Sequence, residues 1–298
     1  MSIVWRLGAL SDRRRPDNRN RNRGGIECGI CGCSSPEVEI ESPPEPPGSS
    51  ERDVGEDQHE LAGDKIASHT HFHGREDIRI LKLEADILSE NRKYAQQNRH
   101  YLRERRVRML NLVSSPGAGK TTLLTETIQK LKNYIAVAVI EGDQQTSRDS
   151  DRIAATGVQA TQINTGKGCH LDAKMVAEAL ESLTLEEGGV LFVENVGNLV
   201  CPADFDLGEG KRVVMLSVTE GDDKPLKYPN IFASSDLMIV TKIDLAPYVD
   251  FDLDACTQYA RRLKPSLEVI RTSAKTGNGI RPWCDWLLGC LESPRIIP

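Results

Sequence analysis

The chain has 298 residues, enough for one large domain with a tail or for two average domains. Its 44 acidic and 38 basic residues give a formal net charge of -6, which argues against a nucleic-acid-binding surface because such surfaces are basic. No apolar run approaches the roughly 20 residues that cross a bilayer. Arginines at positions 13–15 follow the short apolar stretch at 3–10, the reverse of the order in a signal peptide. We therefore expect a soluble, cytoplasmic protein with no nucleic-acid or membrane partner.

Residues 1–74 contain too few apolar residues to build a core. Met1–Arg23 has seven arginines, and Ser34–Asp64 has ten acidic residues and five of the fifteen prolines. Because so little apolar surface cannot offset the entropy lost on ordering, we expect this segment to be disordered.

Metal-ligand residue types gather within that segment. Cys28, Cys31 and Cys33 fall within six residues, and soft thiolates select Zn²⁺, Cu(I) or Ni²⁺ over Mg²⁺. Metal binding is favoured over redox chemistry because glycines interrupt the cluster and no strand precedes it. A backbone nitrogen or His59 would supply a fourth ligand. Three further histidines fit either a metal site or a solvated patch, and they are His69, His71 and His73.

An amphipathic pattern begins where the N-terminal segment ends. Leucine or alanine recurs every seven residues from Leu81 to Leu102, which describes one apolar stripe on a helix. We expect a helix over Glu76–Arg105, in a segment of residues 75–106 that packs on the following domain or on a second subunit. The stripe consists of Ile78, Leu81, Ala85, Leu88, Ala95 and Leu102.

Residues 107–298 alternate short apolar runs with helical segments. Both faces of the runs are apolar and helices separate most of them, which predicts an α/β fold with a mostly parallel sheet covered on both faces. Ligands bind such sheets at the carboxyl ends of the strands. The expected strands are 109–113, 135–140, 158–163, 190–193, 213–218, 237–240 and 267–270. The expected helices are 120–131, 147–155, 172–183, 254–263 and 280–291.

The first core strand runs into a glycine-containing loop, Gly-Lys-Thr and a helix, the context that identifies the P-loop of an NTPase. Backbone N–H groups of the loop approach the phosphates, Lys120 reaches the β- and γ-phosphates, and the Thr121 hydroxyl holds Mg²⁺. Ser114 stands where the pattern has its first glycine, so we expect a slightly different turn. The expected phosphate-binding residues are Gly117, Ala118, Gly119, Lys120, Thr121 and Thr122.

Two later fragments predict recognition of guanine. Thr241-Lys242-Ile243-Asp244 resembles the Asn-Lys-x-Asp element of GTPases, with threonine replacing asparagine. The Asp244 carboxylate accepts N1–H and the exocyclic amine of guanine, whereas adenine would leave it unpaired. Ser273-Ala274-Lys275 matches the next GTPase element. Found in this order after a P-loop, the two fragments favour GTP over ATP. The residues expected to contact the guanine base are Thr241, Lys242, Asp244, Ser273, Ala274 and Lys275.

Two carboxylates at strand ends complete the expected catalytic set. Asp143 follows the second strand, and Glu194 opens a Glu-x-x-Gly where other GTPases have Asp-x-x-Gly. We expect Asp143 and Glu194 to hold Mg²⁺ with Thr121 and to orient the attacking water beside Lys120. The alternative for each is a solvated carboxylate at a strand end. No arginine is recognisable as a charge-stabilising finger, which predicts slow intrinsic turnover.

The remaining cysteines divide into two kinds. Cys169-His170 precedes a helix, and Cys201 follows the segment that should move with the γ-phosphate, so a metal there would sense GTP. Chance cysteines are the alternative. Three others fall on helical segments and are expected to be buried packing residues: Cys256, Cys284 and Cys290.

Four stretches carry a resemblance to a known family: Ser115–Thr122, Asn164–Asp172, Glu194–Pro202 and Thr219–Pro229. With the Cys28–Cys33 cluster, they resemble the hydrogenase nickel-incorporation GTPase family, HypB, from residue 75 to the C-terminus. The resemblance implies a GTPase that delivers nickel to the large-subunit precursor of NiFe-hydrogenase together with a small zinc-containing nickel chaperone.

The resemblance also implies a homodimer that forms on GTP or metal binding. Its interface would hold a nickel or zinc site made by Cys169, His170 and Cys201, separate from an N-terminal nickel site at Cys28–Cys33. Relatives with such a cluster carry it near the initiator, so the arginine-rich leader here points to a misassigned start site.

Three other functions compete with this one. A urease-type nickel GTPase shares the chemistry, but the Cys28–Cys33 cluster and the Cys169-His170 pair argue against it. A nickel-binding storage protein would need little GTPase activity. A small-molecule P-loop kinase would leave the guanine fragments without a role.

Overall fold

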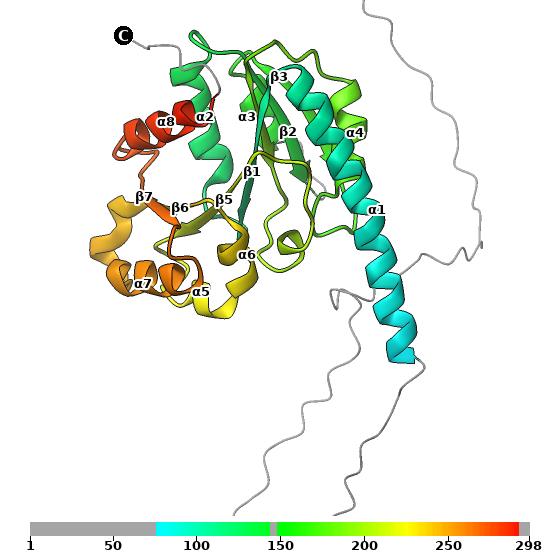
Figure 1. Cartoon of the computed structure of the whole chain (residues 1–298). Helices are drawn as coiled ribbons and strands as arrows, with labels where there is room; N and C mark the ends of the chain where they lie inside the picture. The colour runs from blue at the N-terminus through cyan, green and yellow to red at the C-terminus, as the bar shows by residue number, and fades with distance from the viewer. Residues whose placement is uncertain (1–75, 144–147, 292–298) are drawn as a thin grey trace, which may run out of the picture. The chain divides into compact units, whose positions relative to one another are not determined.

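The computed structural model describes residues 76–143 and 148–291 of the chain (Figure 1). The expectations for residues 1–74, including the Cys28–Cys33 cluster and the histidines at 59, 69, 71 and 73, lie outside the described residues. Within the described ranges, no helix combines the length and the apolar character needed to cross a membrane.

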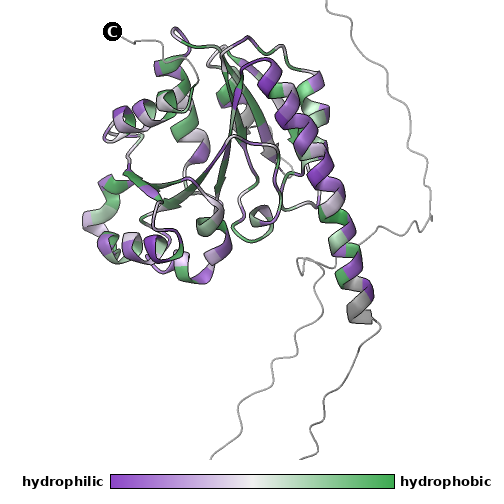
Figure 2. Cartoon of the chain, viewed as in Figure 1, coloured by the Kyte–Doolittle hydropathy of each residue, from purple (hydrophilic) through white to green (hydrophobic). Residues whose placement is uncertain are grey.

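The described residues form a seven-stranded sheet in which all neighbouring strands are parallel, as the alternating pattern predicts. The order is β3-β2-β4-β1-β5-β6-β7, which places β1 and the P-loop after it at the centre. The central strands are largely hydrophobic (Figure 2), because both of their faces are covered, whereas the edge strands β3 and β7 are partly exposed. They are β1 (Arg108–Ser114), β2 (Val137–Asp143), β3 (Gln159–Asn164), β4 (Val190–Glu194), β5 (Lys211–Ser217), β6 (Leu237–Thr241) and β7 (Glu268–Arg271).

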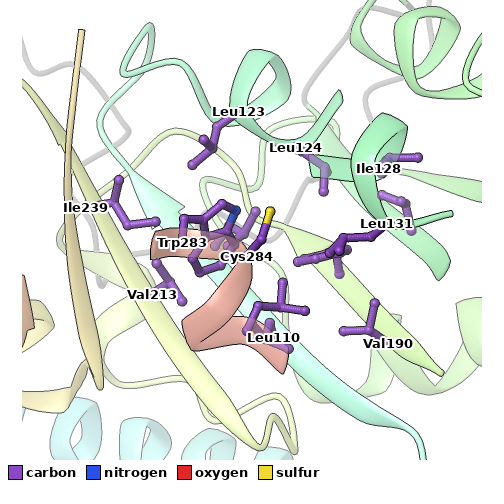
Figure 3. Packing of buried hydrophobic residues seen from close by; sticks show 14 of the residues in the cluster. Leu110, Leu123, Leu124, Ile128, Leu131, Val190, Val213, Ile239, Trp283 and Cys284 are labelled. Carbon is purple, nitrogen blue, oxygen red and sulfur yellow. The ribbon is translucent and has the colours of Figure 1, made fainter. Parts of the chain in front are cut away.

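Helices cover both faces of the sheet. They are α1 (Glu76–Glu104), α2 (Lys120–Leu131), α3 (Arg148–Ala154), α4 (Ala173–Glu181), α5 (Lys224–Lys227), α6 (Pro229–Ser234), α7 (Leu253–Leu263) and α8 (Ile280–Gly289). On one face, Trp283 of α8 packs among residues of α2 and the strands (Figure 3), and its Nε1 donates to Thr127 Oγ1 at 2.8 Å. On the opposite face, Leu102 of α1 and Leu180 of α4 pack on the half of the sheet that contains β2 and β4. Helices α6 and α7 cover the other half.

Among the described side chains of α1, the predicted apolar stripe is buried only in its C-terminal half. Ala95 and Leu102 are 0 % and 3 % exposed, whereas Leu81 is 63 % exposed. The reason is length: the 29 residues of α1 span about 43 Å, and strands of at most seven residues span about 23 Å. The helix is confirmed, and packing of its N-terminal half on a second subunit stays a prediction.

Several element boundaries differ from the predicted ones. β2 continues through Glu141, Gly142 and Asp143, because these residues remain paired with residues of β3 in the parallel sheet. β5 begins at Lys211 and includes the buried Arg212, which interrupts the apolar pattern. The short helices α5 and α6 were not predicted, because four and six residues are too few to show a helical period.

Candidate nucleotide and metal site

Two glycines and a buried lysine shape the loop between β1 and α2. Gly117 and Gly119 have φ of 74° and 98°, in the left-handed region that glycine adopts without strain. Lys120 is 8 % exposed, and its Nζ donates to Ser114 Oγ at 2.9 Å. Ser114, which replaces the first glycine of the pattern, thus holds the lysine inside the loop. The loop and the N-terminus of α2 provide the backbone N–H groups that bind phosphates.

Carboxylates and a hydroxyl meet in the cleft of about 460 Å³ beside this loop. Thr121 Oγ1 donates to Glu194 Oε1 at 2.7 Å. Lys120 and Asp143 line the same cleft, so the structure brings together the four residues expected to act on the phosphates. Carboxylate and hydroxyl oxygens are the ligands that Mg²⁺ prefers, and this donor set therefore fits magnesium.

Two charged residues of the cleft were missed by sequence reasoning. Glu141 is 3 % exposed and stands beside Glu194 in the register of β2 and β4. Its position two residues before Asp143 was the available signal, since alternate strand residues share a face. Arg152 of α3 also lines the cleft, and its Nη2 donates to Thr122 Oγ1 at 3.1 Å. Nothing in the sequence around it indicated that position.

A second, largely apolar cavity of about 260 Å³ adjoins the cleft and is lined by the predicted base-recognition residues. Ser273 Oγ donates to Asp244 Oδ1 at 2.6 Å, which fixes the carboxylate. The cavity also includes Ala274 and Lys275. Its apolar walls suit a planar base, and the fixed carboxylate suits the paired donors of guanine.

Thr241 and Lys242 join the two cavities. Thr241 Oγ1 donates to the carbonyl of Ala118 at 2.6 Å. The threonine that replaces asparagine therefore connects the segment 241–244 after β6 to the P-loop. Lys242 has φ of 56°, and its Nζ donates to the carbonyl of Gly117 at 2.7 Å. Lys242 lines both cavities, which places its side chain along the path from phosphate to base.

Cys169, His170 and Cys201 form a cluster whose ligand atoms all lie within 4.8 Å of one another. The two sulfurs are 3.0 Å apart, and Cys169 Sγ lies 3.6 Å from His170 Nδ1. All three residues are half-buried. Thiolates and imidazole are ligands of Zn²⁺ and of Ni²⁺ rather than of Mg²⁺, so the cluster fits a transition metal.

The surroundings of His170 favour the neutral form of its imidazole. Burial lowers its pKa below the usual 6.5, and the negative charge of Asp172 opposes this shift only in part. The ring of Phe205 packs on the imidazole with 4.0 Å between ring centroids. A neutral imidazole has the free lone pair that a metal requires.

Helix α1 fixes the start of α4 and the end of the loop after Cys201. Asn98 Nδ2 donates to the carbonyls of Ala173 and Leu207 at 2.8 and 3.0 Å. Asn91 Oδ1 accepts the N–H of Ala173 at 2.8 Å. Both asparagines are buried, so their polar groups tie together two loops: the metal loop (165–172), which carries Cys169 and His170, and the Cys201 loop (195–210).

A buried arginine holds the Cys201 loop from the sheet side. Arg212 donates to Glu209 Oε1 at 2.8 Å, and their side chains are 7 % and 6 % exposed. It also donates to the carbonyls of Ala203 at 3.0 Å and Phe205 at 2.9 Å. The loop that carries Cys201 and the ring against His170 is therefore anchored to β5.

The other described cysteines lie away from this cluster. Cys256 and Cys284 are buried, and burial raises the pKa of their thiols to about 12 and about 11. Both are packing residues, as predicted. Cys290 is half-buried just after α8, so the prediction that it is a buried packing residue is wrong. The cause is its position at the C-cap, beyond the last helical residue.

Comparison with known proteins agrees with this geometry. The family model for the CobW/HypB/UreG nucleotide-binding domain matches residues 108–271. The hydrogenase maturation factor HypB of Escherichia coli (strain K12) is 55% identical over 218 residues, 73% of this chain and 75% of that protein. HypB of Cupriavidus necator is 44% identical and covers 88% of both chains. The crystal structure of HypB from Helicobacter pylori in complex with nickel is 36% identical with a TM-score of 0.65, and the match covers 70% of this chain and 100% of that one. The chain belongs to the HypB family of hydrogenase maturation factors.

Proposed function

We propose that the protein hydrolyses GTP and uses the hydrolysis cycle to insert nickel into the large-subunit precursor of NiFe-hydrogenase. One observation carries the proposal: the segment from Glu194 to Cys201 has a carboxylate of the phosphate cleft at one end and a thiol of the metal cluster at the other. Family membership supports hydrogenase as the target, and the nickel complex of the Helicobacter pylori relative supports nickel as the ion.

The nucleotide in this proposal is GTP. Asp244, held by Ser273, presents acceptors to the two donors on one edge of guanine. Adenine has an acceptor at the equivalent ring position, so its binding would leave a carboxylate unpaired in an apolar cavity. The contacts of Thr241 and Lys242 with the P-loop fix the distance between the base cavity and the phosphate cleft.

Hydrolysis requires charge stabilisation and an oriented water. When bound, Mg²⁺ neutralises phosphate charge, and Thr121, Glu194 and Asp143 are the residues that would hold it. Lys120 stabilises charge on the β- and γ-phosphates, and Asp143 or Glu194 orients the water. Glu141 lines the same cleft and adds an acceptor for magnesium-bound water.

Slow intrinsic turnover is part of the proposal. Arg152, the one arginine among the described residues that line the phosphate cleft, donates to the hydroxyl of Thr122 and has an exposed side chain. An exposed guanidinium is screened by water and stabilises transition-state charge weakly.

Nickel or zinc is the cargo of the cluster Cys169, His170 and Cys201. Three donors from one chain support a site shared between two subunits, in a homodimer that forms when GTP or metal binds. The N-terminal Cys28–Cys33 cluster would be a second nickel site. A small zinc-containing nickel chaperone and the hydrogenase precursor would be the partners, in the cytoplasm.

A hydrolysis assay with GTP or ATP, with and without Ni²⁺, tests the enzyme. We expect GTP to be preferred, and a preference for ATP would contradict the assignment of Asp244. Nickel affinity measured with GDP or with a non-hydrolysable GTP analogue tests the coupling. We expect the two affinities to differ in the parent protein and to become equal in Cys201→Ala. Equal affinities in the parent would reject the coupling.

A further inference from the structure

The side chain of Asn195 connects the phosphate cleft with the metal loop. Asn195 follows Glu194 directly, lines the phosphate cleft and is 1 % exposed. Its Oδ1 accepts hydrogen bonds from the N–H groups of Leu171 at 3.1 Å and Val196 at 2.9 Å. One amide oxygen therefore joins the segment that leaves β4 to the residue that follows His170.

Asn111, on the central strand β1, fixes the orientation of this amide. Asn195 Nδ2 donates to Asn111 Oδ1 at 3.3 Å, and Asn111 Nδ2 donates to Glu209 Oε1 at 3.2 Å. If the Asn195 amide were flipped, its NH₂ group would face the N–H of Leu171 and its oxygen would face Asn111 Oδ1. The network therefore permits one orientation, in which the oxygen points to Leu171.

Leu171 lies between a fixed element and the phosphate cleft. Two residues later, Ala173 is bonded to both Asn91 and Asn98, so hydrogen bonds tie the start of α4 to α1. On the cleft side, Gly142 packs on Leu171 so closely that an added Cβ would lie 2.8 Å from its side chain. A displacement of Asn195 must therefore be taken up by the short stretch that contains Cys169 and His170.

The segment after Asn195 touches the P-loop. An added Cβ at Gly197 would lie 2.8 Å from Pro116 Cα, and Val196 and Gly197 both line the phosphate cleft. A γ-phosphate in this cleft would add negative charge near the backbone of Gly197, whereas the N–H of Val196 is already bonded to Asn195 Oδ1, and that charge would attract the segment. Loss of that phosphate removes the attraction.

We propose that Asn195 is the positioning residue through which the nucleotide state sets metal affinity at Cys169, His170 and Cys201. The inference rests on the proposed function, because it explains how the GTP state would control metal transfer. Asn195 is not one of the three residues of the metal cluster, so its proposed role is to position the loop that carries two of them. Its amide oxygen accepts the Leu171 N–H and so transmits a displacement of Asn195 to Leu171, and Asn111 keeps the amide in the orientation that this hydrogen bond requires.

The test compares Ni²⁺ affinity in two nucleotide states. The full chain carries Cys28→Ala, Cys31→Ala and Cys33→Ala, which leaves the internal cluster to be measured in GDP and in a non-hydrolysable GTP analogue. We expect an affinity ratio in the roughly 5- to 150-fold range typical of allosteric coupling for this parent, and a ratio of about one for Asn195→Ala. A purely structural defect would weaken binding in both states and leave the ratio unchanged.

Two further variants keep the test decisive. Asn111→Ala frees the Asn195 amide to turn and should lower the ratio even if Asn195→Ala does not fold. Asn164→Ala is the matched control, because Asn164 is exposed and its side chain accepts a hydrogen bond from the N–H of Gly166 at the start of the same loop, and it should keep the parent ratio. A parent ratio retained by both Asn195→Ala and Asn111→Ala overturns the inference and leaves the proposed function standing. A ratio of one in the parent overturns both.

Discussion

At the residue scale, the proposed recognition of the base depends on how Asp244 is held. Ser273 Oγ donates to its Oδ1 at 2.6 Å, in a cavity with mostly apolar walls. Asp244→Asn replaces an acceptor by a donor. We expect GDP affinity to fall by about 10- to 100-fold, because the donors of guanine lose their partner. Affinity for xanthosine diphosphate should rise, since xanthine has a carbonyl where guanine has the amine.

Equilibrium titration with both nucleotides measures this change. Ser273→Ala is the control, because it loosens the carboxylate without changing its chemistry and should weaken GDP binding without favouring the xanthine nucleotide. An unchanged GDP affinity in Asp244→Asn would remove Asp244 from the base site.

The thiol of Cys256 makes stability depend on pH in the alkaline range. Burial raises its pKa from 9.0 to about 12, so the native protein keeps this proton at a pH where the unfolded chain has lost it. The contribution of this protonated thiol to the unfolding free energy is fully present below pH 9. It falls as pH rises towards 12, by up to about 1.4 kcal/mol per pH unit. Cys256→Ala should therefore show a shallower loss of unfolding free energy between pH 9 and 10 in urea titrations. Equal slopes in both proteins would contradict this assignment.

Among elements, the anchoring of the Cys201 loop to β5 depends on a buried ion pair. Glu209→Ala would leave the Arg212 guanidinium buried without its carboxylate, and we expect unfolding free energy to fall by about 3–5 kcal/mol. The double variant Arg212→Met with Glu209→Leu should recover part of this loss. Urea unfolding measures all three proteins.

An exposed pair gives the matched control. Arg106 and Glu187 are 3.2 Å apart, with side chains 68 % and 69 % exposed. Glu187→Ala should change unfolding free energy by less than about 1 kcal/mol, because water screens this pair. Similar losses of unfolding free energy from Glu187→Ala and Glu209→Ala would show that burial does not determine how much the Arg212–Glu209 pair contributes to stability.

The elements that the sequence predicted well are those whose own residues determine them. Apolar runs such as 237–240 are buried on both faces, and that composition is local. β5 was misplaced at its start because Arg212 is polar yet buried, which depends on partners such as Phe205 and Glu209. The exposure of Leu81 likewise depends on where the sheet ends.

For the whole molecule, the phosphate cleft and the base cavity share Gly119, Thr122 and Lys242 as lining residues. The site exists only when the loops after β1, β6 and β7 meet at one edge of the sheet. A nucleotide should therefore bind the folded chain and not the unfolded one. GDP with Mg²⁺ at 100 times its dissociation constant should raise the unfolding free energy by about 2.7 kcal/mol. ADP at the same concentration should stabilise less.

Thermal unfolding with each nucleotide checks this expectation. Lys120→Ala should abolish most of the effect of GDP, because its Nζ lies inside the P-loop. Equal stabilisation by ADP and GDP would contradict guanine recognition.

Much of the candidate site was predictable because its motifs are contiguous. The P-loop and Thr241–Asp244 each place their residues within a few positions, and the parallel sheet brings their loops to one edge. Asn195 was not predictable, since its partners Leu171 and Asn111 are 24 and 84 positions away. Arg152 was missed for the same reason, because its neighbour Thr122 is 30 positions away.

At the proposed metal site, the half-buried position of Cys169, His170 and Cys201 would determine how an ion arrives and leaves. Zinc usually takes four ligands, so three donors leave one corner for an incoming group. A ligand atom from another protein could occupy the fourth coordination position before a thiolate of this cluster dissociates. The ion would then be transferred without a fully hydrated intermediate. Handover by this route would accelerate with the concentration of the acceptor, whereas spontaneous escape into water would not.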